Sequence, residues 1–295
     1  MRVFITGAGG YVGGVVAARL LAAGHTVSGL ARSDESEERI RRLGAAPRRG
    51  GLEDVRVLRS AAEEADVVVH AAVDYVDPSF AVREEAALDA LLDGGSGKPL
   101  IYTSSTIVLY DTGPEPVGED RLRDAAAETL QPFKRRGEQR VLEAGGTVVR
   151  LGLVYGRNGS TLPTALLSSA RADGVSRYVG SGETRWSTVH VDDAADLFVR
   201  IVETPPSQGT LVHAVEADAA TFREIAEAIG RNAGVPAATM TREQAAGAFG
   251  PLAGQLTRNL WVVPTRAAEL YGWQPASKGI LHDLECARGA QWTQT

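Results

Sequence analysis

The chain has 295 residues, of which 44% are hydrophobic and 23% are charged, and its formal net charge is −6. This acidic balance argues against nucleic acid or an anionic membrane as a partner. The one cysteine, Cys286, excludes a disulfide scaffold and cysteine-rich metal sites. The histidines show no metal-ligand spacing, so no metal is predicted, and the absence of a basic leader or long apolar segment indicates a cytoplasmic protein.

The N-terminal segment joins an apolar strand at residues 3–5 to a glycine-rich turn and then to a helix. Three glycines follow the spacing G-x-x-G-x-x-G. The first permits a sharp turn, the second leaves room for a pyrophosphate, and the third lets the helix lie close to the strand. The helix N-terminus directs free N–H groups at the phosphates. The alternative is a tight turn without a ligand. The residues predicted to contact a dinucleotide here are Gly7, Gly10, Tyr11, Val12 and Gly13.

Strand and helix signals continue to alternate through roughly the first two hundred residues. Further strands are predicted at 25–30, 66–72, 99–105 and 147–154. Helices are predicted at 35–43, 52–65, 81–92 and 135–144, with a polar loop at about 111–120. This alternation predicts the α/β class, with a doubly wound parallel sheet of the Rossmann type and right-handed crossovers.

Beyond Tyr155 the alternation becomes less regular. Two amphipathic helices are predicted at 162–172 and 222–233, and segments 192–202 and 211–215 are expected to return to the sheet. Residues 1–156 and 189–215 would therefore form the dinucleotide-binding domain. Residues 157–188 and 216–295 would form a smaller C-terminal substrate-binding lobe.

Six stretches of the chain match a known protein family. They are TGAGGYVG at 6–13, VHAA at 69–72, YTSS at 102–105, RLGLVYG at 150–156, VHVDD at 189–193 and YGWQP at 271–275. They span nearly the whole chain in the expected order, so the chain resembles the extended and atypical short-chain dehydrogenase/reductases, often labelled NAD-dependent epimerase/dehydratase. The resemblance implies NAD(P) on the sheet, a small-molecule substrate between two lobes, and a homodimer formed through sheet-flanking helices. It also implies cofactor contacts at Ala71, Ala72, Thr103 and Leu153.

The end of the second strand bears on the choice between NAD and NADP. NAD-preferring relatives carry an acidic residue there, about 20 residues past the glycines, which bonds the ribose hydroxyls. Here Ala31 removes the charge that would repel a 2′-phosphate, while Arg32 and Ser33 supply donors for it. NADP is therefore predicted; the alternatives are NAD and a solvated Arg32. Leu52, in a Gly-Gly-Leu run where relatives have Gly-Asp-Leu, is expected to offer backbone groups to the adenine.

The family's catalytic pair is absent from the chain. In most relatives a tyrosine and a lysine four residues later perform acid/base chemistry. The three lysines of this chain have glycine, leucine or glutamine four positions before them. Phe133 and Gly137 stand where the resemblance places the pair. The cationic run 134–136 could polarise an oxyanion or hold an acidic substrate, and a solvated helix face is the alternative.

Three hydroxyl side chains are candidates for the missing chemistry. Ser105 matches the family's catalytic serine and Thr106 lies beside it; the alternative for both is to cap backbone at the strand end. Tyr110 could act as a substitute acid, although its match is to a structural position in relatives. His190 is interpreted as structural. Substrate contacts are expected, with loop or core packing as the alternative, from Asp74, Tyr75, Phe133, Tyr155 and Trp186.

The sequence thus predicts an NADP-dependent oxidoreductase of the carbonyl or ketone reductase type, with a non-standard proton donor and a small organic substrate, such as a secondary metabolite. Two alternatives remain. One is an epimerase or dehydratase with tightly bound NAD(P), and the other is a non-catalytic NAD(P)-binding sensor.

Overall fold

The structure is a computed structural model that describes residues 1–74, 77, 79–120, 129–157, 159, 161–206, 208–250 and 252–286. The predicted substrate contact Tyr75 lies outside these residues. Within the described ranges, no helix is both long enough and apolar enough to cross a bilayer.

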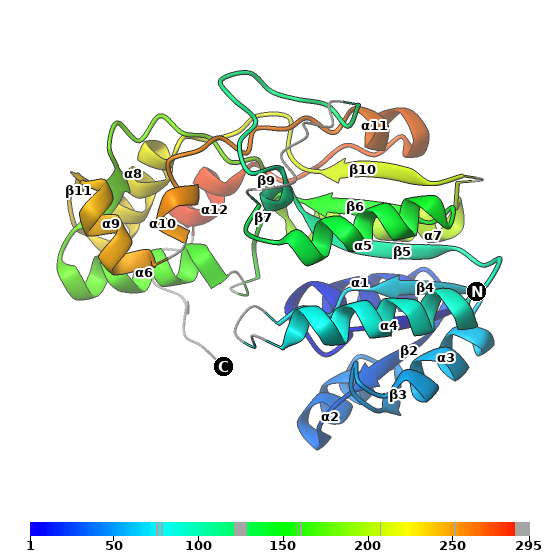
Figure 1. Cartoon of the computed structure of the whole chain (residues 1–295). Helices are drawn as coiled ribbons and strands as arrows, with labels where there is room; N and C mark the ends of the chain where they lie inside the picture. Colours follow the sequence, from blue (N-terminus) through cyan, green and yellow to red (C-terminus); the bar gives the residue numbers. More distant parts are fainter. Residues whose placement is uncertain are drawn as a thin grey trace.

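Seven parallel strands form the main sheet, in the order β3-β2-β1-β4-β5-β6-β10 (Figure 1). The predicted doubly wound α/β fold is therefore confirmed. Their bounds are β1 Arg2–Thr6, β2 Thr26–Ala31, β3 Ala46–Arg49, β4 Val67–His70, β5 Leu100–Ser105, β6 Thr147–Leu151 and β10 Thr210–Ala214.

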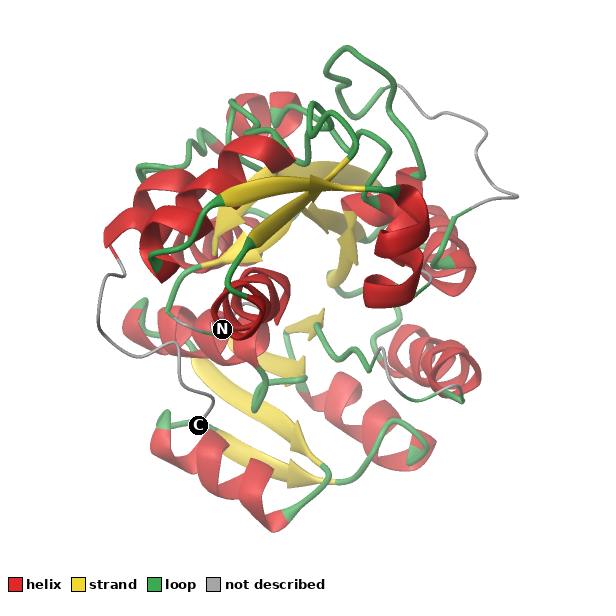
Figure 2. Ribbon diagram, turned by 90° about the vertical axis from the view of Figure 1, so that its left-hand side faces the viewer, coloured by secondary structure: helices red, strands yellow, loops and turns green. Residues whose placement is uncertain are grey.

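Helices cover both faces of this sheet (Figure 2). Successive side chains of β1 point to opposite faces: Val3 and Ile5 pack in one apolar core, and Phe4 packs in the other. The first core is closed by α1 (Tyr11–Ala22), α2 (Asp34–Arg42) and α7 (Val191–Glu203). The second is closed by α3 (Val55–Glu64), α4 (Phe80–Gly94) and α5 (Pro132–Glu143).

The sheet differs from the prediction at three places. The strand expected at 147–154 ends at Leu151, and the Leu153 N–H bonds the Ser187 carbonyl oxygen outside the main sheet. Gly152 permits this close approach, since a Cβ there would lie 2.4 Å from the same oxygen. Residues beyond it form β7 (Leu153–Tyr155), which pairs with β9 (Thr188–His190). Segment 192–202 returns as helix α7 and not as a strand, whereas 211–215 supplies β10 as expected. Strand β3 was not predicted.

The remaining elements gather mostly beside the carboxyl ends of the main sheet (Figure 1). They are α6 (Thr161–Asp173), β8 (Ser176–Val179), α8 (Phe222–Ala233), β11 (Ala237–Met240), α9 (Arg242–Phe249), α10 (Leu252–Gln255), α11 (Thr265–Tyr271) and α12 (Ile280–Cys286). Two further apolar cores lie among them. Helix α11 instead packs on the main sheet, since Ala267 and Tyr271 belong to its first core. The predicted division into two lobes stays a prediction.

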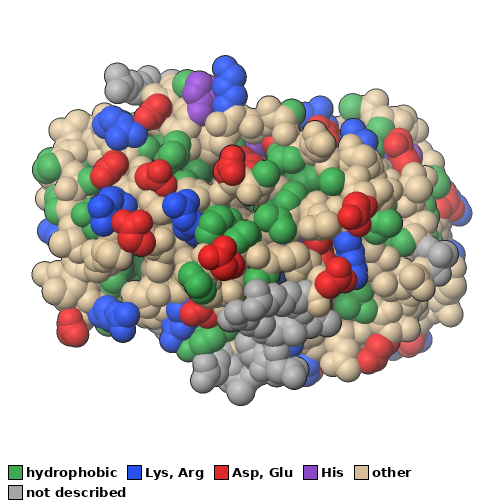
Figure 3. All heavy atoms as spheres, turned by 90° about the horizontal axis from the view of Figure 1, so that it is seen from above, with side chains coloured by type: hydrophobic (Ala, Val, Ile, Leu, Met, Phe, Trp, Pro, Cys, Tyr) green, Lys and Arg blue, Asp and Glu red, His purple; other side chains and the backbone are tan. Residues whose placement is uncertain are grey.

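Charged side chains are dispersed over the surface that Figure 3 presents. On this face acidic and basic groups alternate around small apolar areas, and neither sign gathers into a single patch.

Candidate functional site

The turn between β1 and α1 is built on close backbone contacts. Gly7 has a φ of +77°, and a Cβ there would lie 2.8 Å from both the Ala71 carbonyl oxygen and the Ala72 nitrogen. A Cβ on Gly13 would lie 2.2 Å from the Gly7 carbonyl oxygen. Any side chain at either position would force the backbone apart. The sharp turn and the close helix approach anticipated from the glycine spacing are both present.

This turn leaves the N-terminus of α1 open. Gly10 is the N-cap and no side chain bonds the first-turn N–H groups. A hollow of about 340 Å³ beside α1 reaches Gly9 and Gly10. Uncapped N–H groups beside bare backbone fit the pyrophosphate of a dinucleotide. The hydroxyl of Tyr11, a predicted dinucleotide contact, donates to the Gly156 carbonyl oxygen at 2.7 Å. Burial raises the pKa of this hydroxyl.

The predicted adenosine contacts converge where β2 ends. Ala31 is the buried last residue of β2, and its carbonyl oxygen accepts from the Gly50 N–H, which brings the segment before Leu52 alongside. Ser33 caps helix α2 through the Ser36 N–H. The Arg32 side chain is 73% exposed, and its Nη1 lies 3.4 Å from Asp74 Oδ2. The carboxylate of Asp74 lies beside Arg32 and also accepts from the Asp77 N–H, and its predicted substrate contact stays a prediction.

A buried ion cluster lies beneath the position of the missing catalytic pair; we call it the Glu84 cluster. Glu84 Oε1 accepts from Lys134 Nζ at 2.8 Å and from the Tyr102 hydroxyl at 2.7 Å. Its Oε2 lies 3.1 Å from His70 Nε2, and His70 Nδ1 lies 2.6 Å from Thr6 Oγ1. Burial would raise the pKa of Glu84, but the charges of His70 and Lys134 hold it well below its usual value.

This cluster corrects the expectation for Lys134. The sequence suggested a solvated face or a cleft-facing cation, yet the side chain is 3% exposed and also donates to the Thr103 carbonyl oxygen. Phe133 packs edge-on against Phe80, with ring centroids 5.7 Å apart. A Cβ on Gly137 would lie 2.4 Å from the Tyr102 hydroxyl oxygen. Tyr102 therefore occupies the space that a side chain at position 137 would need.

The three hydroxyl candidates lie at the carboxyl end of β5 and in the segment that follows it. Ser105 Oγ accepts from the Ile107 N–H and so caps the short helix η1 (Thr106–Leu109). This is the backbone-capping role that was predicted as the alternative to catalysis. Thr106 is buried. Tyr110 is half-buried at the end of η1 and has a φ of +62°.

Two residues from distant sequence hold Tyr110. The amide nitrogen of Gln255 donates to its carbonyl oxygen at 2.5 Å, and the guanidinium carbon of Arg258 lies 4.1 Å from the centre of its ring. Neither residue was identified from the sequence, because no local pattern marks a partner 145 residues away.

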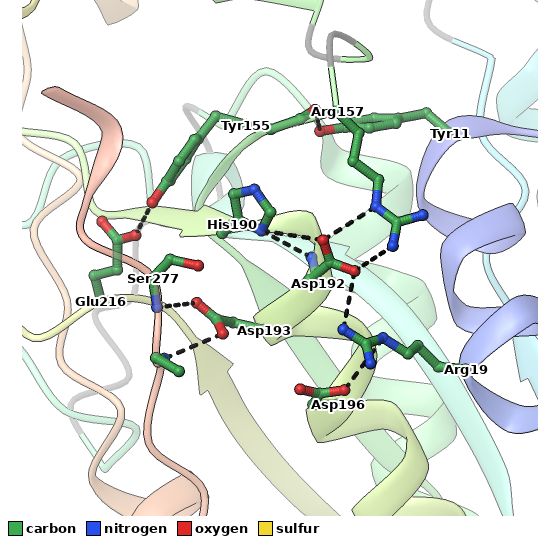
Figure 4. A network of polar contacts seen from close by, with 12 residues as sticks. Tyr11, Arg19, Tyr155, Arg157, His190, Asp192, Asp193, Asp196, Glu216 and Ser277 are labelled. Atoms are coloured by element: carbon green, nitrogen blue, oxygen red, sulfur yellow. Dashed lines mark hydrogen bonds and ion pairs between the residues drawn. The ribbon is translucent and has the colours of Figure 1, made fainter. Parts of the chain in front are cut away.

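A second polar network surrounds the start of α7 (Figure 4). Arg19 and Arg157 both bond the carboxylate of Asp192. The His190 ring accepts from the Asp192 N–H and so caps α7, in keeping with the structural interpretation. Beside it, the Tyr155 and Thr188 hydroxyls donate to Glu216.

Glu216, Tyr155 and Trp186 are all buried. Burial raises the pKa of Glu216 and of Tyr155. Tyr155 is 1% exposed, and Trp186 is 5% exposed and packs edge-on against Phe222. Their burial argues against the predicted substrate contacts and favours the core alternative. In the described part of the chain, no three His, Cys, Asp or Glu side chains are arranged to hold a metal.

Comparison with known proteins points to one protein family. Residues 3–213 match the model of the NAD dependent epimerase/dehydratase family. The chain is 33% identical over 298 residues to the uncharacterized protein YLL056C of Saccharomyces cerevisiae, covering 96% of this chain and 98% of that one. It is 29% identical over 227 residues to the 4-hydroxy-2-methyl-3-oxo-4-farnesyl-3,4-dihydroquinoline-1-oxide ketoreductase of Stigmatella aurantiaca, covering 70% and 66%.

Solved structures show the same fold. The dTDP-glucose 4,6-dehydratase of Bacillus anthracis, in complex with NAD, superposes with a TM-score of 0.78 at 15% identity, covering 97% of this chain and 94% of that one.

Proposed function

Because the chain belongs to the NAD dependent epimerase/dehydratase family, we propose that it is an NADP-dependent oxidoreductase that reduces a carbonyl group of a small organic molecule. The observation that carries the proposal is the uncapped N-terminus of α1 behind the Gly7 and Gly13 contacts. Similarity to a ketoreductase over 70% of the chain supports the reaction type.

In this proposal the protein holds the dinucleotide largely through its backbone. The first-turn N–H groups of α1 bond the pyrophosphate, and backbone groups near Leu52 face the adenine. When bound, the cofactor supplies the hydride. The further proposed contacts are Ala31, Ala71, Ala72, Thr103 and Leu153.

Arg32 is the proposed determinant for NADP. Its present partner, Asp74, is 3.4 Å away and the guanidinium is mostly exposed, so this ion pair is weak. A 2′-phosphate carries more charge than the carboxylate and accepts two parallel hydrogen bonds from a guanidinium. Ser33 lies next to Arg32 and supplies a further donor.

The reaction end of the site lies where β5 ends. Ser105 Oγ accepts one backbone hydrogen bond and keeps its own proton, which it donates to the substrate carbonyl oxygen in this proposal. Thr106 is the neighbouring candidate, and Phe133 offers an apolar contact at the start of α5.

The alternatives are supported less well. The resemblance implies that sugar-nucleotide epimerases and dehydratases use the tyrosine–lysine pair, and here Phe133 and Gly137 stand in its place. A sensor would make no use of the hydroxyl groups that follow β5. A cytoplasmic location and a homodimer stay predictions.

The cofactor assignment is tested with Arg32→Ala, using calorimetry with NADPH and with NADH. Loss of a charge-assisted contact is expected to weaken NADPH about tenfold or more and to leave NADH within about twofold. Arg41→Ala, which removes another exposed arginine of the same region, is the matched control and should change neither affinity. Equal weakening of both cofactors would contradict phosphate recognition.

The reaction is tested with purified protein, NADPH and a panel of ketones and conjugated carbonyl compounds. Consumption of NADPH together with formation of an alcohol is the expected result. Cofactor that stays bound through purification and shows no net absorbance change during turnover would favour the epimerase or dehydratase. Binding without turnover of any compound would favour the sensor.

A further inference from the structure

We propose that Tyr110 is the proton donor of this site and that Arg258 and Gln255 are the positioning residues that prepare it. The inference rests on the proposed carbonyl reduction. Three observations carry it: the backbone conformation of Tyr110, the cation over its ring, and the absence of a hydrogen-bond partner for its hydroxyl within the described residues.

The backbone of Tyr110 is held in a costly conformation. Its φ of +62° and ψ of −62° lie in a region that bulky residues rarely adopt. Among the described non-glycine residues, Arg157 alone shares a positive φ. Such conformations persist only where surrounding contacts impose them, and they concentrate at functional sites. The imposing contact is the hydrogen bond from Gln255, a side chain that is 1% exposed.

Two hydrogen bonds hold Arg258 beside Tyr110. The backbone carbonyl of Arg258 accepts from the indole N–H of Trp186 at 3.0 Å, and Trp186 is packed in the third apolar core. The Arg258 guanidinium also donates to the Gly254 carbonyl oxygen. A fixed guanidinium 4.1 Å from the ring centre attracts the ring and favours negative charge on the phenol oxygen as its proton leaves.

The other tyrosines that the structure describes lack this combination. The hydroxyls of Tyr11, Tyr102 and Tyr155 donate to protein oxygens. Tyr178 has an arginine, Arg223, 5.6 Å from its ring centre, but it lies in the regular strand β8, away from the end of β5. Tyr110 follows the candidate hydroxyl Ser105 by five positions in the sequence, so one short segment carries both groups.

The proton step balances as follows. The substrate carbonyl carbon gains a hydride from the reduced cofactor, which is oxidised, and the C=O double bond becomes a single bond. The carbonyl oxygen takes the proton of the Tyr110 hydroxyl, so one O–H bond breaks and another forms. Water then returns a proton to the phenolate.

The first test needs no turnover. Tetranitromethane nitrates ionised tyrosines, and mass spectrometry locates the product. Nitration of Tyr110 is expected to slow about fivefold in Arg258→Gln and to be largely kept in Arg258→Lys, which retains a cation. Tyr178 serves as the internal control and should be unaffected in both variants. An unchanged rate at Tyr110 in Arg258→Gln would overturn the role of the cation.

A second test measures the strain directly. In most positions alanine stabilises a fold more than glycine does, but at a φ of +62° the order should reverse. Tyr110→Gly is therefore expected to melt a few degrees above Tyr110→Ala. Equal or reversed melting temperatures would show that no strain is held at Tyr110.

The third test uses the carbonyl substrate found in the panel. Tyr110→Phe should lower kcat about 100-fold or more while NADPH affinity and melting temperature stay unchanged. Arg258→Gln should lower kcat with little effect on KM, and Arg258→Lys should recover part of the loss. An active Tyr110→Phe overturns this inference alone. If the wild-type protein reduces no carbonyl compound, the proposed function and the proton step are both overturned. The nitration and melting tests then still decide whether Arg258 acts on Tyr110 and whether the Tyr110 backbone is strained.

Discussion

Glu84 and Glu216 are both almost completely buried, and each accepts a hydrogen bond from a buried tyrosine hydroxyl. Burial would raise the pKa of either group. Around Glu84 it is outweighed by His70 and Lys134, which hold the pKa well below its usual value. Around Glu216 the additional partner is the hydroxyl of Thr188, and burial prevails, so the pKa is raised. The neighbours of a buried carboxyl group, more than its depth, decide whether it carries a charge.

The contrast also bears on the reaction. The Glu84 cluster lies against α5, where the resemblance places the tyrosine–lysine pair, and its cation is committed to a buried carboxylate. This region therefore resembles a structural ion cluster more than a proton relay open to substrate. The proposed chemistry instead uses Ser105, at the carboxyl end of β5, and Tyr110, at the end of η1.

The largest expected effect follows from removing the cation of the Glu84 cluster. Lys134→Met leaves a buried carboxylate with His70 as its one remaining counter-charge among the described residues and is expected to reduce the free energy of unfolding by about 3–5 kcal/mol. Urea unfolding measures the loss. Lys278→Met, which alters an exposed lysine, should change stability by less than about 0.5 kcal/mol. A similar small change for Lys134→Met would mean that the cluster is not ionised.

A smaller effect is expected where Tyr102 fills the space beside Gly137. Gly137→Ala places a Cβ 2.4 Å from the Tyr102 hydroxyl oxygen and should cost about 1–3 kcal/mol. The matched control is Gly247→Ala in α9, where a Cβ meets nothing within 4 Å and alanine should gain up to about 1 kcal/mol. If both variants are stabilised, Tyr102 can leave the cluster at little cost, and the pair Phe133→Tyr with Gly137→Lys becomes feasible.

The smallest effect distinguishes the two carboxyl groups by pH. The folded-state pKa of Glu216 lies above the usual 4.5, so its contribution to stability rises as the pH falls from that raised pKa toward 4.5. The folded-state pKa of Glu84 lies below 4.5, so its contribution is complete above 4.5 and is lost as the pH falls through the lowered pKa.

Unfolding free energies of wild type, Glu216→Gln and Glu84→Gln at about pH 7 and about pH 5 test this assignment. Between these two conditions, Glu216→Gln should lack the gain in stability toward lower pH that Glu216 gives the wild type. Glu84→Gln should keep that dependence while being less stable at both pH values. The opposite pattern would contradict the pKa directions given for the two groups.

Local patterns in the sequence predicted the features that depend on neighbouring residues. The glycine turn, the alternation that builds the parallel sheet, and the capping alternative for Ser105 are of this kind. Strand β3 was missed because Ala-Pro-Arg-Arg has no apolar alternation and is a strand only by pairing with β2.

Distant contacts explain the rest of what was missed. The ion pair of Lys134 joins residues 50 positions apart, so its burial could not be inferred from three consecutive cations. The partners of Tyr110 are further away still, and Tyr155 and Trp186 are buried by elements whose packing no motif describes.

The place of β10 in the sheet has a consequence for synthesis of the protein. Strand β6 ends at Leu151, but its outer neighbour β10 does not begin until Thr210. At about 5–20 residues per second, a ribosome needs roughly 3–12 seconds to cover that interval. Throughout it, the nascent chain presents the unpaired edge of a strand that is buried in the finished protein. Chaperone demand and aggregation during translation should therefore peak before residue 210 leaves the exit tunnel.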